Sequence, residues 1–140
     1  MDLFEQIKKD EGFRRYPYRC PAGALTIGYG RNIDEEKGGP GIAEDEAAFM
    51  LRNDLVGAEL HLKALFGNWG AMGQVRRNAL LNMRFNLGPF RFGGFVKMIT
   101  AVQKGYWDVA GREARDSRWY FQVGQRAERI ARELETGVSL

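Results

Sequence analysis

The sequence predicts an α+β fold that is mostly helical, with an antiparallel hairpin near the amino terminus and a carboxy-terminal lobe built from helices. Three observations predict it. Two short strand-like runs lie between Asp10 and Gly30, a long apolar stripe at helical spacing follows over 43–66, and helical spacing dominates from Gln74 onward. The chain has 140 residues, which is enough for one domain with a sizeable core.

The first helix is predicted over the residues before Gly12. Asp2 is a suitable N-cap, and Gly12 is expected to end the helix just past Glu11, at the junction with the hairpin. Three apolar side chains lie on one side of this helix at helical spacing: Leu3, Phe4 and Ile7.

The hairpin is predicted from a Pro-Ala-Gly turn at 21–23. A three-residue loop places Cys20 opposite Ala24 and Tyr18 opposite Thr26. Since strand side chains alternate, these four residues share one face, and Cys20 and Thr26 are diagonal neighbours on it.

The two faces of the hairpin are expected to differ. Thr26 is followed by Gly28 and Gly30, so its face has room for a bulky ligand. The other face is expected to cover a small apolar layer: Leu25, Ile27 and Tyr29.

The remaining chain is predicted to be helical after an exposed connection over 31–41. A long helix over 43–66 is expected to connect two lobes, and a buried central helix runs from Gln74 to Leu87 until Gly88 stops it. Further helices are expected around 95–102, 107–114 and 126–134, with Ser117 capping a turn before the last one. We therefore expect one domain, 1–140, whose lobes are 11–42 and the pair 1–10 and 67–140, with a cleft between them.

Composition limits the function. A single cysteine excludes an internal disulfide framework, and together with a single histidine it argues against a zinc site, so no metal and no cofactor are expected. The net charge of +3 arises from interleaved acidic and basic residues without a basic block, so nucleic-acid binding is not expected. The start of the chain lacks the pattern of a secretion signal, and no apolar run is long enough for stable membrane insertion.

Glu11 is the first chemical candidate. A glutamate at a helix end is usually solvated and structural, but this one is held beside a hairpin face with little bulk. Aromatic side chains at Phe13, Tyr16 and Tyr18 are expected to shield it, and such desolvation favours the protonated form that a general acid needs.

Cys20 and Thr26 are the second and third candidates. A lone cysteine is usually a small buried hydrophobe, but nearby arginines at 14, 15 and 19 are expected to favour the thiolate. Thr26 is of interest for its diagonal relation to Cys20. A cysteine protease would need a histidine partner, and His61 lies in the long helix, so this reading is disfavoured.

The spacing of these three residues resembles a known signature. Glu11, eight residues, Cys20, five residues and Thr26 is similar to the Glu-x8-(Asp or Cys)-x5-Thr pattern of the phage lysozymes of glycoside hydrolase family 24, the T-even type. The hairpin segment over 10–32 and the later runs RRNALLNMRFNLG, GGF, SRWY and QRAERI are similar as well. The resemblance covers nearly the whole chain and implies a lysozyme-like fold.

The resemblance implies hydrolysis of the β-1,4 bond between N-acetylmuramic acid and N-acetylglucosamine in bacterial peptidoglycan. It assigns Glu11 as general acid and Thr26 as the hydroxyl that helps to place the attacking water. It also implies that Phe85 lines the saccharide site and that Arg126 forms an ion pair with Glu11. Three family contact positions carry different residue types here: Asn32, Met98 and Glu113.

Cys20 occupies the position where many family members have an aspartate, so the usual pair of carboxylates is missing. The thiolate can accept a proton from the attacking water, can attack the sugar itself with retention, or can be a spectator while Glu11 and Thr26 act. We favour the first, because cysteine is a recurring variant at this position in the family that the chain resembles.

The resemblance implies an endolysin, expected to be a monomer. With no export signal visible, it is expected to accumulate in the host cytoplasm, to need a holin for access to the wall, and then to act on the periplasmic cell wall. The alternative is a catalytically silent protein that binds peptidoglycan or serves as a structural part of the virion.

Overall fold

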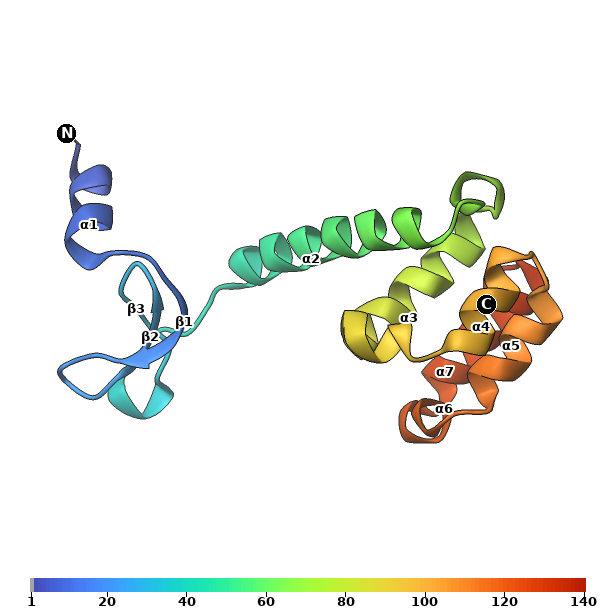
Figure 1. Cartoon of the computed structure of the whole chain (residues 1–140). Helices are drawn as coiled ribbons and strands as arrows, with labels where there is room; N and C mark the ends of the chain where they lie inside the picture. Colours follow the sequence, from blue (N-terminus) through green and yellow to red (C-terminus); the bar gives the residue numbers. More distant parts are fainter. Residues whose placement is uncertain (1) are drawn as a thin grey trace. The chain divides into compact units, whose positions relative to one another are not determined.

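A computed structural model describes residues 2–140 of the chain, with seven helices and three strands in that range (Figure 1). The mostly helical α+β class is confirmed. The helices are α1 (Leu3–Glu11), α2 (Glu44–Leu65), α3 (Gln74–Gly93), α4 (Val96–Gln103), α5 (Trp107–Arg115), α6 (Arg118–Val123) and α7 (Gln125–Thr136). The strands are β1 (Arg14–Arg19), β2 (Leu25–Gly28) and β3 (Arg31–Asn32), and short 3-10 helices occupy Glu35–Lys37 and Trp69–Ala71. By its contacts the chain divides into residues 1–50 and 51–140.

Helix α1 begins and ends as the sequence predicts. The Asp2 carboxylate accepts a hydrogen bond from the Glu5 N–H at 2.9 Å, and Gly12 redirects the chain with φ 72°. The apolar stripe of α1 is not covered, since Leu3 and Phe4 are each 69% exposed. Helix α1 therefore adds no buried apolar side chains, and its last residue is Glu11.

The sheet is antiparallel with the order β1-β2-β3. Tyr18 pairs with Thr26, as predicted, and the Cys20 N–H donates to the Ala24 carbonyl at 2.9 Å, which closes the three-residue turn. The expected connection at 31–41 is wrong at its start, because β3 pairs there with β2 and places Asn32 opposite Thr26. Strand β3 has only two residues, too few to show an alternating pattern.

The expected burial of the two hairpin faces is also corrected. Ala24 and Thr26 are the buried residues of the hairpin, at 6% and 4% exposure, whereas Leu25 and Ile27 are only half-buried. A Tyr29 ring that is 45% exposed completes the face predicted to be apolar. The two buried residues thus lie on the face that carries Thr26, and both also line a hollow on that face.

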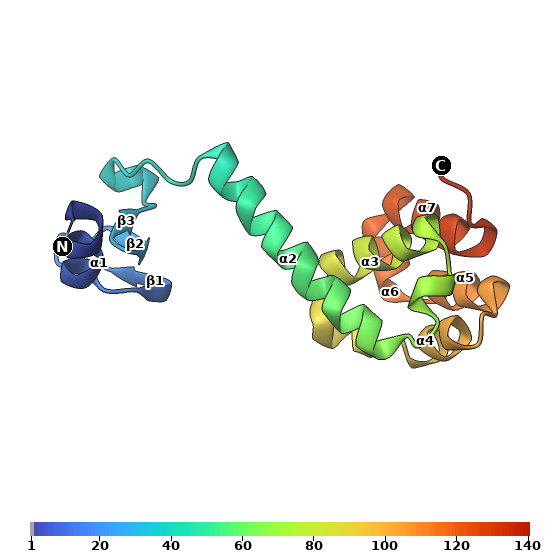
Figure 2. The ribbon, with the colours of Figure 1, turned by 90° about the horizontal axis from the view of Figure 1, so that it is seen from above.

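The core lies in residues 51–140, where α3 to α7 pack together (Figure 2). Helix α3 supplies its centre with the fully buried Leu80 and Met83, and α7 directs Ala127, Ile130 and Leu134 inward as predicted. Gly88, with φ 79° and ψ 167°, breaks α3 where the sequence predicts its end, and a further helical turn follows from Pro89. Ser117 caps α6 by accepting the Tyr120 N–H at 3.1 Å.

Candidate active site on the hairpin

One hollow of about 420 Å³ in residues 1–50 is lined by Glu11, Cys20 and Thr26. The structure thus brings together the three side chains that the sequence singles out. Each comes from a different local structure: the last residue of α1, the turn after β1 and the second residue of β2. Other lining residues include Tyr18, Ala24, Gly30, Asn32 and Lys37.

Glu11 lies directly on the backbone of Gly30. A Cβ atom added to Gly30 would be 2.9 Å from both Cδ and Oε2 of Glu11, closer than real Cβ contacts allow. An alanine here would push the Glu11 side chain aside, and its backbone would be strained at the positive φ of 79°. The Glu11 carboxylate therefore occupies the space that a side chain at position 30 would take.

The expected aromatic shielding of Glu11 is not found. Glu11 is exposed, and two of the three aromatics are exposed too, Phe13 at 60% and Tyr16 at 75%. Phe13 instead packs against the Tyr29 ring, with centroids 5.7 Å apart. Tyr18, the third aromatic, is half-buried and lines the hollow together with Glu11.

The Cys20 thiol is half-buried, and its pKa is lowered, as expected for a group that favours the thiolate. The main cause is a backbone hydrogen bond from Ala24, and partial burial works against it; backbone hydrogen bonds from Ala22 and Gly23 contribute further lowering. The expected cause, cationic neighbours, is wrong. The turn itself stabilises the thiolate through its N–H groups.

The arginines near Cys20 are engaged elsewhere. The Arg14 guanidinium lies over the Tyr18 ring at 4.4 Å from the centroid, and Arg19 donates to the Gly23 carbonyl at 3.0 Å. Arg19 also pairs with Asp34. Their charges are thus directed at a ring, a carbonyl and a carboxylate.

The Thr26 hydroxyl is buried and oriented. Its Oγ1 donates to the Ala24 carbonyl at 2.8 Å, which uses its single proton. Its oxygen lone pairs therefore remain as acceptors. A water in the hollow can donate to this oxygen.

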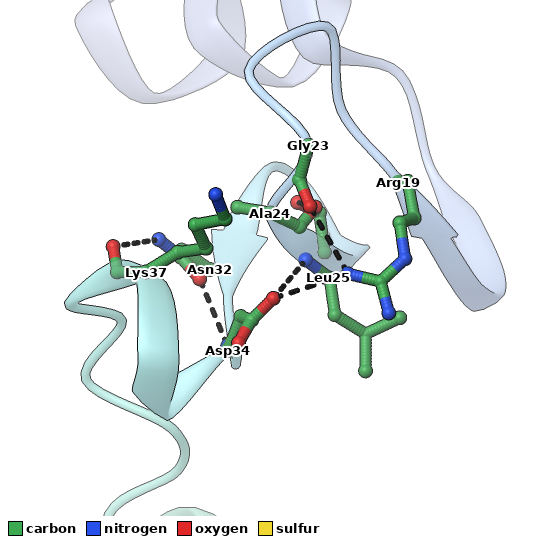
Figure 3. A network of polar contacts seen from close by, with 8 residues as sticks. Arg19, Gly23, Ala24, Leu25, Asn32, Asp34 and Lys37 are labelled. Carbon is green, nitrogen blue, oxygen red and sulfur yellow. Dashed lines mark hydrogen bonds and ion pairs between the residues drawn. The ribbon is translucent and has the colours of Figure 1, made fainter.

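Asp34 is a contributor that the sequence analysis missed. Its carboxylate accepts the Leu25 N–H at 3.2 Å and lies 3.3 Å from Arg19 Nη1, and its own N–H donates to Asn32 Oδ1 at 2.9 Å (Figure 3). The Leu25 N–H, and after it the Arg19 charge, hold the pKa of Asp34 below its ordinary value. Asp34 does not line the hollow, so it is no substitute for the missing second carboxylate. The only local sequence signal for this structured loop is the pair of glycines at 38 and 39 after Asp34.

Phe85 and Arg126 lie in residues 51–140. Phe85 on α3 is 42% exposed and borders a separate hollow of about 450 Å³ with Asp54 and Arg84. Arg126 Nε donates to Asn82 Oδ1 at 2.9 Å. The saccharide contact of Phe85 and the ion pair between Arg126 and Glu11 stay predictions.

His61 is engaged in its own unit. Arg84 Nε donates to His61 Nδ1 at 2.9 Å, so this ring nitrogen acts as an acceptor from a cation. Burial, and after it the Arg84 charge, lowers the pKa of His61.

Within residues 2–140 no group of three or more histidine, cysteine, aspartate or glutamate side chains is arranged to hold a metal ion. None of the helices described for residues 2–140 has the length and apolar character that crossing a membrane requires.

Comparison with known proteins places the chain. A family model described as phage lysozyme matches residues 8–133. The chain belongs to the phage lysozyme family. It is 25% identical to "Probable T4-type lysozyme 1" of Dictyostelium discoideum, over 95% of this chain and 93% of that protein. Membership of this family supports glycoside hydrolase activity.

Two other relatives are matched over less of their length. The chain is 30% identical to the "Pre-baseplate central spike protein Gp5" of Enterobacteria phage T4, over 98% of this chain but 28% of that protein. It is 36% identical to the "SAR-endolysin" of Haemophilus phage HP1, over 56% of this chain and 41% of that protein. The chain thus spans less than half the length of these two relatives.

Proposed function

We propose that this phage lysozyme is a muramidase that hydrolyses the β-1,4 bond between N-acetylmuramic acid and N-acetylglucosamine of bacterial peptidoglycan. One observation carries the proposal: a carboxyl, a thiol of lowered pKa and a hydroxyl with free lone pairs line the same hollow. These are a proton donor, a base and a water acceptor, the groups that a single displacement at the anomeric carbon needs.

The proposed reaction uses each group once. Glu11 in its protonated form gives its proton to the departing glycosidic oxygen. Thr26 accepts a hydrogen bond from a water, and the Cys20 thiolate takes a proton from that water as its oxygen bonds to the anomeric carbon. The glycosidic bond breaks with inversion, and the thiol and the Glu11 carboxylate then exchange their proton through solvent.

Two variants of this scheme keep the same hollow. In one, the Cys20 sulfur attacks the sugar and a second displacement by water restores it, with net retention. In the other, Cys20 is a spectator and Thr26 alone orients the water. We favour the thiolate as base, since the turn already stabilises its charge.

The biological setting is proposed as host cell lysis. The enzyme acts as an endolysin that is held in the host cytoplasm until a holin opens the membrane, and it then works as a monomer on the periplasmic wall. The net charge of +3 favours binding to anionic wall material, an attraction that weakens as salt rises.

The experiment is loss of turbidity of cells stripped of their outer membrane. The wild-type protein is expected to clear them, and Glu11→Gln, which cannot donate the proton, is expected to lose roughly a hundredfold or more of that rate. Equal clearing by the two proteins would refute Glu11 as the general acid.

A second candidate is a virion component that binds peptidoglycan without cutting it. The similarity of almost the whole chain to a central spike protein of phage T4 favours it. This candidate predicts that the wild-type protein co-sediments with purified peptidoglycan but leaves stripped cells turbid.

A further inference from the structure

The turn that carries Cys20 is held from outside by two charged side chains. Arg19 Nη1 donates to the Gly23 carbonyl at 3.0 Å and lies 3.3 Å from Asp34 Oδ2. The same Asp34 oxygen accepts the Leu25 N–H at 3.2 Å, directly after the turn (Figure 3). One guanidinium nitrogen and one carboxylate oxygen thus fix both sides of the turn.

Asp34 is itself held firmly. Its N–H donates to Asn32 Oδ1 at 2.9 Å, and its carbonyl accepts the Gly39 N–H at 2.8 Å. A Cβ on Gly39 would clash with the Asn32 side chain, so the loop closes tightly on this point. The Asp34 side chain is only 13% exposed, so water has little access to compete for its hydrogen bonds with Arg19 and Leu25.

We propose that Arg19 and Asp34 are positioning residues for Cys20, holding the turn over 21–24 so that its backbone N–H groups face the sulfur. The inference rests on the proposed catalytic role of Cys20. It assigns a purpose to a network that lies outside the hollow.

The sign of the effect separates positioning from direct electrostatics. A nearby negative charge disfavours a thiolate, so if Asp34 acted only through its charge, its removal would lower the thiol pKa. If Asp34 instead holds the N–H groups in place, its removal raises the pKa toward its ordinary value. The other titratable groups lining the hollow with Cys20 are Glu11, Tyr18 and Lys37, and all are unchanged in the variants below.

The test is the pH dependence of Cys20 alkylation by iodoacetamide, since this is the only thiol of the chain and the thiolate is the reactive form. Asp34→Ala and Arg19→Ala are expected to raise the midpoint of the profile and to slow alkylation at neutral pH roughly threefold to tenfold. Asp34→Asn keeps an acceptor for the Leu25 N–H and is expected to lie between wild type and Asp34→Ala.

Matched controls remove similar charges elsewhere. Arg15→Ala removes an exposed arginine of the same strand, and Glu36→Gln removes an exposed carboxylate of the same loop. Both are expected to leave the alkylation profile unchanged. A shift in Arg15→Ala equal to that in Arg19→Ala would overturn the proposal, because charge alone would then suffice.

A lower or unchanged midpoint in Asp34→Ala would also overturn it. Unfolding would also raise the midpoint, so alkylation of each variant is measured at a temperature below its thermal transition, which circular dichroism locates. If Asp34→Ala does not fold, the result for Asp34→Asn decides. Alkylation needs no glycan. Wild-type protein inactive on peptidoglycan refutes the proposed function, whereas unshifted profiles refute only the positioning role.

Discussion

At the scale of single residues, the site depends on how closely groups approach one another. Glu11 lies against Gly30, and the Cys20 thiolate is stabilised by N–H groups of its own turn. Small substitutions at these contacts are expected to affect activity far more than stability.

Gly30→Ala is expected to displace the Glu11 carboxylate, because the new Cβ would lie 2.9 Å from it. We expect turnover to fall by roughly tenfold or more. Gly38→Ala is the control, since Gly38 also has a positive φ, 73°, but its Cβ would meet nothing within 4 Å. Both variants should lose about 1 kcal/mol of stability from backbone strain, and equal activity in the two would refute the contact.

Cys20→Ser is expected to reduce turnover by about a hundredfold, because a hydroxyl is a far weaker base than a thiolate. Cell clearing measures the rate, and NMR of the new reducing end identifies its anomer. Inverted product from the wild type is expected. Net retention would contradict the single displacement, and a wild-type rate in Cys20→Ser would remove any role for the thiolate.

At the scale of elements, three helices are joined through one carboxylate. Glu128 on α7 accepts hydrogen bonds from Arg115 on α5, at 2.9 and 3.1 Å, and from the Tyr120 hydroxyl on α6, at 2.8 Å. The Arg115 guanidinium, and after it the Tyr120 hydroxyl, lowers the pKa of Glu128 to about 2. Arg115 also pairs with Glu135.

This carboxylate makes the helical part sensitive to acid. Because its pKa is depressed in the folded state, Glu128 stabilises the fold above its ordinary pKa of 4.5, and this contribution is lost as the pH falls toward about 2. Glu128→Gln should therefore be less stable than wild type at neutral pH, with the difference disappearing over that range. Denaturant unfolding at several pH values measures it. Glu133→Gln, which removes a pair with Arg129 at 3.6 Å within α7, should show a smaller difference; a pH-independent loss in Glu128→Gln would contradict the assignment.

The sequence predicts helix boundaries well where a single capping or helix-breaking residue sets them. Asp2, Gly12, Gly88 and Ser117 all mark boundaries that the structure has. Strand β3 was missed because pairing with β2, not its own two residues, makes it a strand. The role of Asp34 was missed for the same reason, since its partners lie 9 and 15 residues away.

In the candidate site too, features set by neighbouring residues could be predicted, whereas those set by distant partners could not. The hairpin register and the shared hollow of Glu11, Cys20 and Thr26 could be predicted from alternation and turn length. The cause of the lowered thiol pKa could not, because backbone N–H directions depend on the folded turn.

At the scale of the whole molecule, the buried apolar side chains are unevenly divided. Every member of the main core cluster lies in residues 51–140, from Leu62 to Leu134. In residues 2–50 only Ala24 and Thr26 are buried. The lobe boundaries and the cleft expected from the sequence stay predictions.

This division predicts how the parts behave when separated. A fragment of residues 51–140 should keep its helical content and a cooperative thermal transition, whereas a fragment of residues 1–50 should not fold alone, having too little buried apolar surface. Far-UV circular dichroism on heating measures both. A non-cooperative 51–140 fragment would contradict the assignment of the core.

The central claim is that Glu11 donates the proton as the glycan is hydrolysed, and the chemical ends of the product test it most directly. Mass spectrometry of digested peptidoglycan should show fragments with reducing N-acetylmuramic acid ends from the wild type and none above background from Glu11→Gln. Anhydro-sugar ends, which a lytic transglycosylase leaves, or the same fragments from both proteins, would contradict it.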